Sequence, residues 1–219
     1  GGTISLDEGE IKGHFGNLNI TGGTITGTND TEIDAGIATI SGNTVITLSK
    51  GASIGADSIL NINGGTFNLS DNGLINAGPY DEYEGVGLIQ MTSGTINMQN
   101  ALIVADASSV DNVRDAGNIQ IKGGTVNVKG GNNIIMTSNN AEVSHISGNN
   151  AVLNVSEGAN LYVYEKYSRD HGTEFFDRFY QKGTLNLLDN ATINLGGTLN
   201  SNINNAAKFN VTSTSAKLN

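Results

Sequence analysis

The sequence lacks several residue types: among 219 residues it has no cysteine, no tryptophan and a single proline. Without cysteine, the chain forms neither a disulfide bond nor a thiolate metal site. Only 11 lysine and arginine residues accompany 21 acidic ones, so the formal net charge is −10 at pH 7. Because an acidic chain is repelled by phosphate backbones and by anionic lipids, we expect no nucleic acid as a partner.

Long apolar runs are also missing. A transmembrane helix needs about 20 consecutive apolar residues, and a signal-peptide core needs about 7 to 15. No run of the sequence approaches the first length, so we expect no direct membrane contact in this fragment. Glycine, by contrast, is abundant at 30 residues, and it is concentrated in a recurring phrase.

The recurring phrase is a glycine, usually one of a pair, followed by threonine and then by alternating apolar and polar residues. Copies begin at Gly1, Gly22, Gly64, Ser93, Gly123 and Lys182, with degenerate copies at Gly42 and Gly148. The strands that these phrases start are separated by 20 to 33 residues. A repeat of this length with a two-residue alternation is typical of a β-solenoid, in which each coil packs only on its neighbours.

The repeat predicts an all-β fold: a right-handed, single-stranded parallel β-helix with about 8–9 coils of three short strands. One strand precedes the glycine corner, the second follows it, and the third comes a few residues later. The alternation places one row of apolar residues inward on the second strand. This inward row consists of Ile4, Ile25, Ile46, Phe67, Ile96, Val126, Leu153 and Leu185.

The same alternation predicts two outward rows on the second strand. One row is mainly threonine (Thr3, Thr24, Val45, Thr66, Thr95, Thr125, Val152 and Thr184), and the other becomes asparagine (Ser5, Thr26, Thr47, Asn68, Asn97, Asn127, Asn154 and Asn186). Stacked asparagine amides can hydrogen-bond from coil to coil. We expect these rows to be structural. Glycine at the preceding corner supplies the positive φ that the turn needs, and Asn43 is expected to do so where the pair is incomplete.

Insertions interrupt the repeat at one corner, between the third strand and the first strand of the next coil. They span 79–87, 106–117, 138–142 and 165–181, and any α-helix is expected only in the last. Loops on a rigid scaffold often carry binding, and aromatic and arginine side chains dominate binding hot spots. The candidate binding residues on this edge are Tyr80, Asp81, Glu82, Tyr83, Glu84, Asp111, Arg114, Asp115, Tyr167, Arg169, His171 and Arg178.

The sequence gives little indication of a catalytic, metal or cofactor site. His14, His145 and His171 lie in unrelated coils, and His145 occupies an outward row with Gln90 and Gln120. Carbohydrate-cleaving sites need carboxylates gathered on adjacent coils, but Asp57 and Asp106 are separated by a coil with Gly78 at that place. No P-loop or HExxH motif occurs. We therefore expect no catalytic residue, no metal site and no cofactor, and only a weak calcium signal in the acidic loops.

The chain has GGT[IFVL]N[LMV] coils, no cysteine and an excess of acidic residues. In these features it resembles the passenger domains of Gram-negative autotransporters, especially self-associating adhesins. The resemblance is one of pattern and covers essentially all 219 residues. It implies a fragment, 1–219, of a longer passenger at the extracellular bacterial cell surface. Its implied partners are a host-surface glycan, a matrix protein or another copy of itself. No catalytic residue of that family carries over.

Three other interpretations stay open. The chain is alternatively a non-binding structural stalk, a polysaccharide-acting β-helix enzyme or an ice-binding module. The asparagine row argues against ice, because a lattice suits regular threonine arrays better. Between the two candidate binding surfaces, the insertion edge and the flat threonine and asparagine rows, we favour the insertion edge.

Overall fold

The computed structural model is built of β-strands, and no helix occurs in the described residues. These are residues 1–78, 85–105, 107–108, 118–138, 144–156, 158–169, 172–176, 179–181, 184–187, 192–195, 208–211 and 217–218. Within them, no helix is long and apolar enough to cross a bilayer.

Most strands belong to two sets that pair in parallel along the molecule. The first set is β1 (Thr3–Asp7), β2 (Glu10–Thr28), β3 (Glu32–Leu48), β5 (Ile59–Ser70), β8 (Leu88–Gln99), β11 (Asn118–Lys129), β13 (Ser144–Ser156), β17 (Thr184–Leu187) and β19 (Lys208–Val211). The second set is β4 (Ser53–Ala56), β6 (Leu74–Ala77), β9 (Leu102–Ala105), β12 (Asn132–Ser138), β14 (Asn160–Arg169), β18 (Thr192–Leu195) and β20 (Lys217–Leu218).

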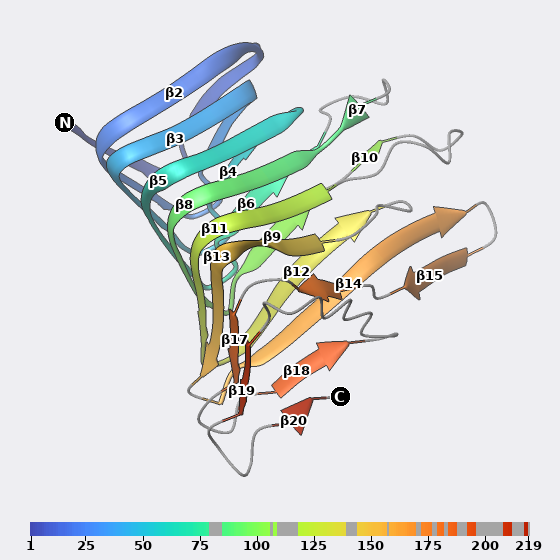
Figure 1. Ribbon diagram of the computed structural model, residues 1–219. Coiled ribbons are helices and arrows are strands. Elements are labelled where there is room, and N and C mark those ends of the chain that lie inside the picture. Colours follow the sequence, from blue (N-terminus) through green and yellow to red (C-terminus); the bar gives the residue numbers. More distant parts are fainter. Residues whose placement is uncertain are drawn as a thin grey trace.

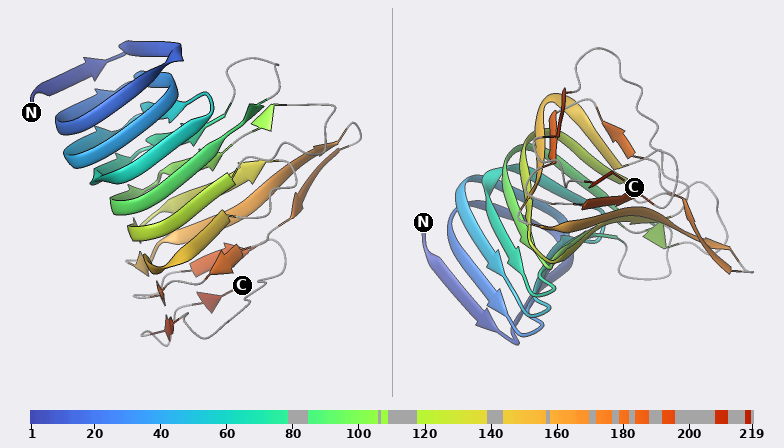
Figure 2. Two further views of the ribbon diagram at one scale, coloured as in Figure 1. Left: turned by 45° about the horizontal axis from the view of Figure 1, so that its top comes forward. Right: turned by 90° about the horizontal axis from the view of Figure 1, so that it is seen from below.

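The pairings stack successive turns of the chain into a solenoid-like arrangement (Figure 1; Figure 2). Each strand of the first set between β1 and β19 pairs with strands one repeat before and one repeat after it, which is consistent with a parallel β-helix. The second set continues a row that begins in β2 and β3, because Ile11 of β2 pairs with Ile33 of β3 and Ile33 pairs with Ile54 of β4. The parallel all-β prediction is therefore confirmed.

The register follows the glycine phrase. Ile25 pairs with Ile46, Ile46 with Phe67, and Phe67 with Ile96, as the sequence predicted. These four side chains are at most 4% exposed, and apolar side chains from both strand sets fill the space between the sheets. Ile4, however, is 43% exposed, because β1 pairs with β2 and no described strand covers its other edge.

The glycine corner differs from the prediction in one respect. The first and second strands of a coil are not separate: β5, β8 and β11 each run through the corner as one bent strand. Gly65 and Gly94 take φ values of 85° and 102° there. A Cβ on Gly94 would lie 2.7 Å from the Gly65 carbonyl oxygen, so glycine is also needed for the close stacking. At the degenerate copy Gly42 takes the positive φ, 64°, and the expectation for Asn43 was wrong.

A second kind of corner, which was not predicted from the repeat, joins the two strand sets. Lys50 and Gly51 both have positive φ, and the Ala52 N–H donates to the Ser49 carbonyl at 3.2 Å. Two consecutive residues of positive φ inside such a bond define a type I′ turn. Asp71 and Asn72 repeat it with φ values of 46° and 66°. These turns could have been predicted from the neighbouring asparagine, aspartate and glycine residues, which tolerate positive φ.

The insertion corner is described in part. β7 (Gly85–Val86) and β10 (Ala107–Ser108), from two successive insertions, pair antiparallel. β14 continues outward into an antiparallel hairpin with β15 (Gly172–Phe176), which extends from the stack (Figure 1; Figure 2). The described part of 165–181 is therefore strand, and β16 (Phe179–Gln181) returns to the solenoid by pairing in parallel with β13.

Candidate functional site

Three titratable side chains meet at the corner where the second strand set passes into the first. His14 lies in β2, Asp34 in β3, and Asp57 in the short link between β4 and β5. The register is interrupted here: Gly13 pairs with Ala35 and Asn17 with Ile37, so three residues of β2 lie opposite one residue of β3. This bulge brings His14 over the next turn of the chain.

Gly36 is the single residue opposite the bulge, and its missing side chain lets the backbone of the bulge lie close to β3. A Cβ on Gly36 would lie 2.7 Å from the His14 carbonyl oxygen and 3.1 Å from that of Gly16. On the other side, the Asp57 N–H donates to the Ala35 carbonyl at 2.8 Å. Backbone contacts on both sides of β3 thus fix the three turns at this corner.

The three side chains converge on one point. His14 Nδ1 lies 3.7 Å from Asp34 Oδ2 and 3.7 Å from Asp57 Oδ2. Their candidate ligand atoms all lie within 4.8 Å of one another. The side chains are 25%, 10% and 16% exposed for His14, Asp34 and Asp57. We call this group the His14–Asp34–Asp57 cluster.

Burial dominates the electrostatics of the cluster. It raises the pKa of Asp34 to about 7, with further contributions from a hydrogen bond between the carboxyls of Asp34 and Asp57 and from their mutual repulsion. Lys12 is paired in register with Asp34, yet its Nζ lies 2.7 Å from Glu32 and 3.3 Å from Glu10. The lysine therefore neutralises two other carboxylates.

The cluster was not predicted from the sequence. The three histidines lie in unrelated sequence contexts, and the repeat suggested a comparison of Asp57 with Asp106, which lies outside the described residues, rather than with Asp34. A carboxylate pair on adjacent turns is present after all. The available signal was that Asp34 and Asp57 lie near the same corner on adjacent coils, two positions apart in register, but the bulge that adds His14 leaves no mark in a repeat alignment.

One stretch of the sequence matches a catalytic motif, but the structure around it is not that of a catalytic site. Gly51–Gly55 reads G-x-S-x-G, the pattern of a nucleophile elbow, in which the serine lies on a sharp turn between a strand and a helix. Ser53 instead begins β4, which stacks between β3 and β6. The match therefore gives no evidence for a nucleophile.

A second surface feature is the outward face of the second strand set. Leu74, Leu102, Ile134 and Tyr162 are paired in register on successive turns. The first three are partly exposed and Tyr162 is 38% exposed. Val104 and Met136 form a parallel, partly exposed row beside them; all six residues make up what we call the apolar outward face. Apolar residues on both sides of a strand are typical of a sheet that is covered on both faces.

The asparagine row on the first strand set forms the predicted ladder of side-chain hydrogen bonds from turn to turn. Asn97 Nδ2 donates to Asn68 Oδ1 at 2.9 Å, Asn127 donates to Asn97 at 2.9 Å, and Asn154 donates to Asn127 at 2.8 Å. Each amide in the middle of the row thus both donates and accepts. Amides that already hydrogen-bond to one another have fewer donors and acceptors left for a ligand.

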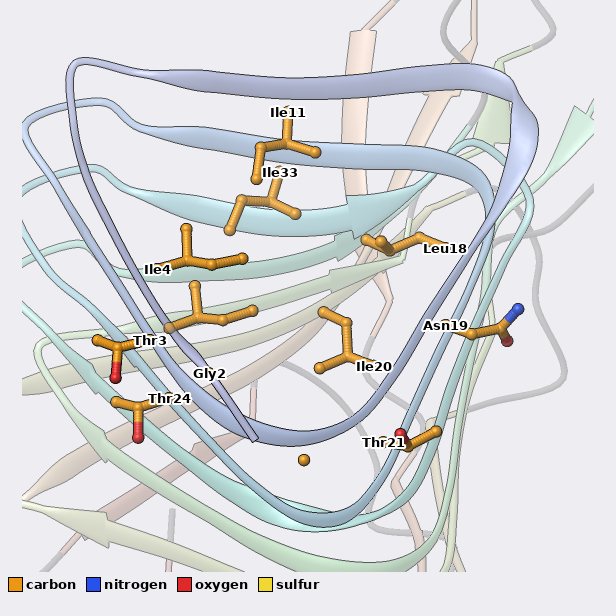
Figure 3. A pocket seen from close by; sticks show the side chains of 12 residues that line it. Gly2, Thr3, Ile4, Ile11, Leu18, Asn19, Ile20, Thr21, Thr24 and Ile33 are labelled. Atoms are coloured by element: carbon orange, nitrogen blue, oxygen red, sulfur yellow. The ribbon is translucent and has the colours of Figure 1, made fainter.

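A hollow of about 370 Å³ lies inside the first turns (Figure 3). Ile4, Ile11, Leu18, Ile20 and Ile33 point into it, while Asn19 points outward. Its interior therefore belongs to the apolar core and offers no convergent polar groups. We assign no chemistry to it.

Most predicted binding residues lie outside the described residues. These are Tyr80, Asp81, Glu82, Tyr83, Glu84, Asp111, Arg114, Asp115, His171 and Arg178. Tyr167 and Arg169 lie in β14, paired with Glu174 and Gly172 of β15, so the structure places both on the protruding hairpin.

Comparison with known proteins finds no matching family model and no significantly similar curated protein or solved structure. Functional inference therefore rests on the geometry of the described residues.

Proposed function

We propose that the chain is a right-handed, single-stranded β-helix of about eight or nine coils with three strands each, and that it serves as an extracellular adhesin. The regular register of the two strand sets supports the coil architecture. The right-handed sense follows from the general preference of parallel crossover connections. In this proposal the chain is a passenger of the autotransporter type, displayed on a bacterial cell surface.

The observation that carries the functional proposal is the apolar outward face. Partly exposed apolar residues recur on successive turns at Leu74, Leu102 and Ile134, and the row continues to Tyr162. Contiguous apolar surface of this kind marks interaction sites. β14, which carries Tyr162, continues into the protruding hairpin, so the face and the insertion edge form adjoining parts of one binding surface.

Self-association between two copies is the mode that we favour, with a host glycan or matrix protein as the other partner class. A solenoid presents the same contact many times along its length. Repeated weak contacts between two rods then add up to avidity without any strong single pair.

The test compares two lysine substitutions on different faces of the solenoid. Ile134→Lys introduces a charge into the apolar outward face, whereas Asn19→Lys introduces the same charge at an exposed polar position of β2, outside that face. Aggregation of cells or beads displaying the full chain is the readout, with circular dichroism as a check on folding. We expect Ile134→Lys to abolish aggregation and Asn19→Lys to leave it largely intact.

A second experiment separates the hairpin from the face. Lys166 and Phe175 are paired across the hairpin, so an Asn-Gly turn in place of residues 167–174 closes the strands between them. This variant removes Tyr167, Arg169 and His171 together. If both it and Ile134→Lys aggregate like the parent, the adhesin proposal fails, and a non-binding stalk becomes the better interpretation.

A polysaccharide-acting enzyme is the second candidate, because Asp34 and Asp57 are gathered on adjacent turns. Their oxygens lie within 4.8 Å and share a hydrogen bond, whereas glycosidase carboxyl groups stand about 5–9.5 Å apart with the sugar between them. The geometry therefore disfavours this candidate. Turnover of acidic or neutral polysaccharides that is lost in Asp57→Asn would establish it.

A further inference from the structure

We propose that His14, Asp34 and Asp57 bind one divalent transition-metal ion, for which Zn²⁺ is the appropriate probe. This site goes beyond the adhesive role and lies on the first turns of the chain, which precede those that carry the apolar outward face. It also departs from the sequence-based expectation that the chain has no metal site.

The first argument is the geometry of the donor atoms. One imidazole nitrogen and two carboxylate oxygens already converge, with both nitrogen–oxygen distances at 3.7 Å. Bonds of about 2.0–2.2 Å from zinc to nitrogen or oxygen put neighbouring ligand atoms roughly 3–3.5 Å apart. Small side-chain rotations therefore suffice for all three atoms to reach a common ion.

The second argument is charge. Two carboxyls that face each other in a largely buried corner need a proton or a cation between them. Lys12, the cation in register with Asp34, is directed to Glu32 and Glu10 instead. A divalent ion would supply the missing positive charge at the point where the two carboxyls and the imidazole meet.

The third argument is preorganisation. Besides the Asp57 N–H bond to Ala35, the Ser58 N–H donates to the Gly36 carbonyl at 3.1 Å and the Ser58 hydroxyl donates to the same oxygen at 2.6 Å. Gly36 in turn admits the close approach of the His14 bulge. The three ligands thus come from three stacked turns whose backbones are held by these contacts, and little ordering remains for metal binding to impose.

The ligand set selects the class of ion. Calcium takes six to eight oxygen ligands, whereas this corner presents an imidazole nitrogen beside two carboxylates. A nitrogen and two oxygens suit zinc and related first-row ions, and three protein ligands leave a fourth position for water or for a group of another molecule. Because the ligands come from three turns, the bound ion would tie these turns together.

The experiment is zinc titration of the purified full chain by isothermal calorimetry, with Co²⁺ absorption spectra as an independent report on coordination. We expect one ion per chain, and an affinity weakened about 100-fold in His14→Gln and in Asp57→Asn. Glu10→Gln is the matched control, because it removes a neighbouring carboxylate outside the cluster. His171→Gln removes a histidine of the insertion corner, and both controls should bind like the parent.

Two outcomes would overturn the proposal. One is a parent chain that binds no Zn²⁺ at about 100 µM free metal. The other is binding that persists in His14→Gln and Asp57→Asn but disappears in His171→Gln, which places the ion elsewhere. Thermal melting without metal verifies that each variant is folded, and both cluster variants keep near-isosteric side chains so that loss of binding is not loss of fold.

Discussion

At the scale of single residues, the corner at Gly36 determines where three titratable side chains meet. Its lack of a side chain admits the three-residue bulge at His14, and the bulge completes the cluster with Asp34 and Asp57. The repeat predicts where the corner falls, but it does not predict the bulge, because two additional residues at a corner leave the apolar alternation on either side of it unchanged.

Replacing Gly36 tests this packing directly. In Gly36→Ala the new Cβ would meet backbone atoms of His14 and Gly16 at 2.7 and 3.1 Å, which have little freedom to move. We expect a loss of about 1–3 kcal/mol in the free energy of unfolding. Gly13→Ala is the control, because no atom lies within 4 Å of its Cβ. Equal melting curves for the two variants would refute the role of Gly36.

The raised pKa of Asp34 predicts how stability depends on pH without metal. Because the folded chain holds a proton up to about pH 7, and an unfolded aspartate releases it near pH 4, the folded state binds more protons in between. The free energy of unfolding therefore falls as pH rises from about 4 to 7, by on the order of 1–3 kcal/mol from this group. Urea melts in EDTA should show that Asp34→Asn removes this decline; an unchanged pH profile in the variant would count against it.

At the scale of elements, the glycine phrase carries most of the predictable structure. The pairing of Ile25, Ile46, Phe67 and Ile96 follows from aligning the phrase, because inward positions alternate and any one-residue slip would expose the row. The type I′ corners were missed because their residues differ in identity from turn to turn. The helix considered for 165–181 was wrong because β14 extends into a hairpin that the repeat does not encode.

The asparagine row makes a measurable contribution at this scale. Asn97 donates to Asn68 and accepts from Asn127, so Asn97→Ala removes two hydrogen bonds and leaves two amide groups partly unsatisfied. We expect a loss of about 1–2 kcal/mol in the free energy of unfolding. Asn19→Ala is the comparison, since Asn19 is exposed on β2 and points away from the core. A cost for Asn97→Ala no larger than that for Asn19→Ala would show that the row is not stabilising.

At the scale of the whole molecule, the stacked turns place unlike features at different positions along one scaffold. The His14–Asp34–Asp57 cluster lies on the first turns, and the apolar outward face begins at Leu74 and reaches β14. Each turn contacts mainly its neighbours, and the turn that carries Asp57 stacks directly on the turn where the apolar outward face begins. The linear stacking of turns in a fixed register is therefore the claim on which the other inferences depend.

Distances between spin labels test that claim most directly, and the absence of cysteine makes the labelling specific. Thr24, Thr95, Thr125 and Val152 follow one another in the same outward row, with Val45 and Thr66 between the first two. Cysteine pairs that combine Thr24 with Thr125 and with Val152 span four and five strand spacings, or roughly 19 and 24 Å at about 4.8 Å each. The account predicts label distances that grow by about 4.8 Å from the first pair to the second. Distances that do not increase with the number of intervening turns would contradict it.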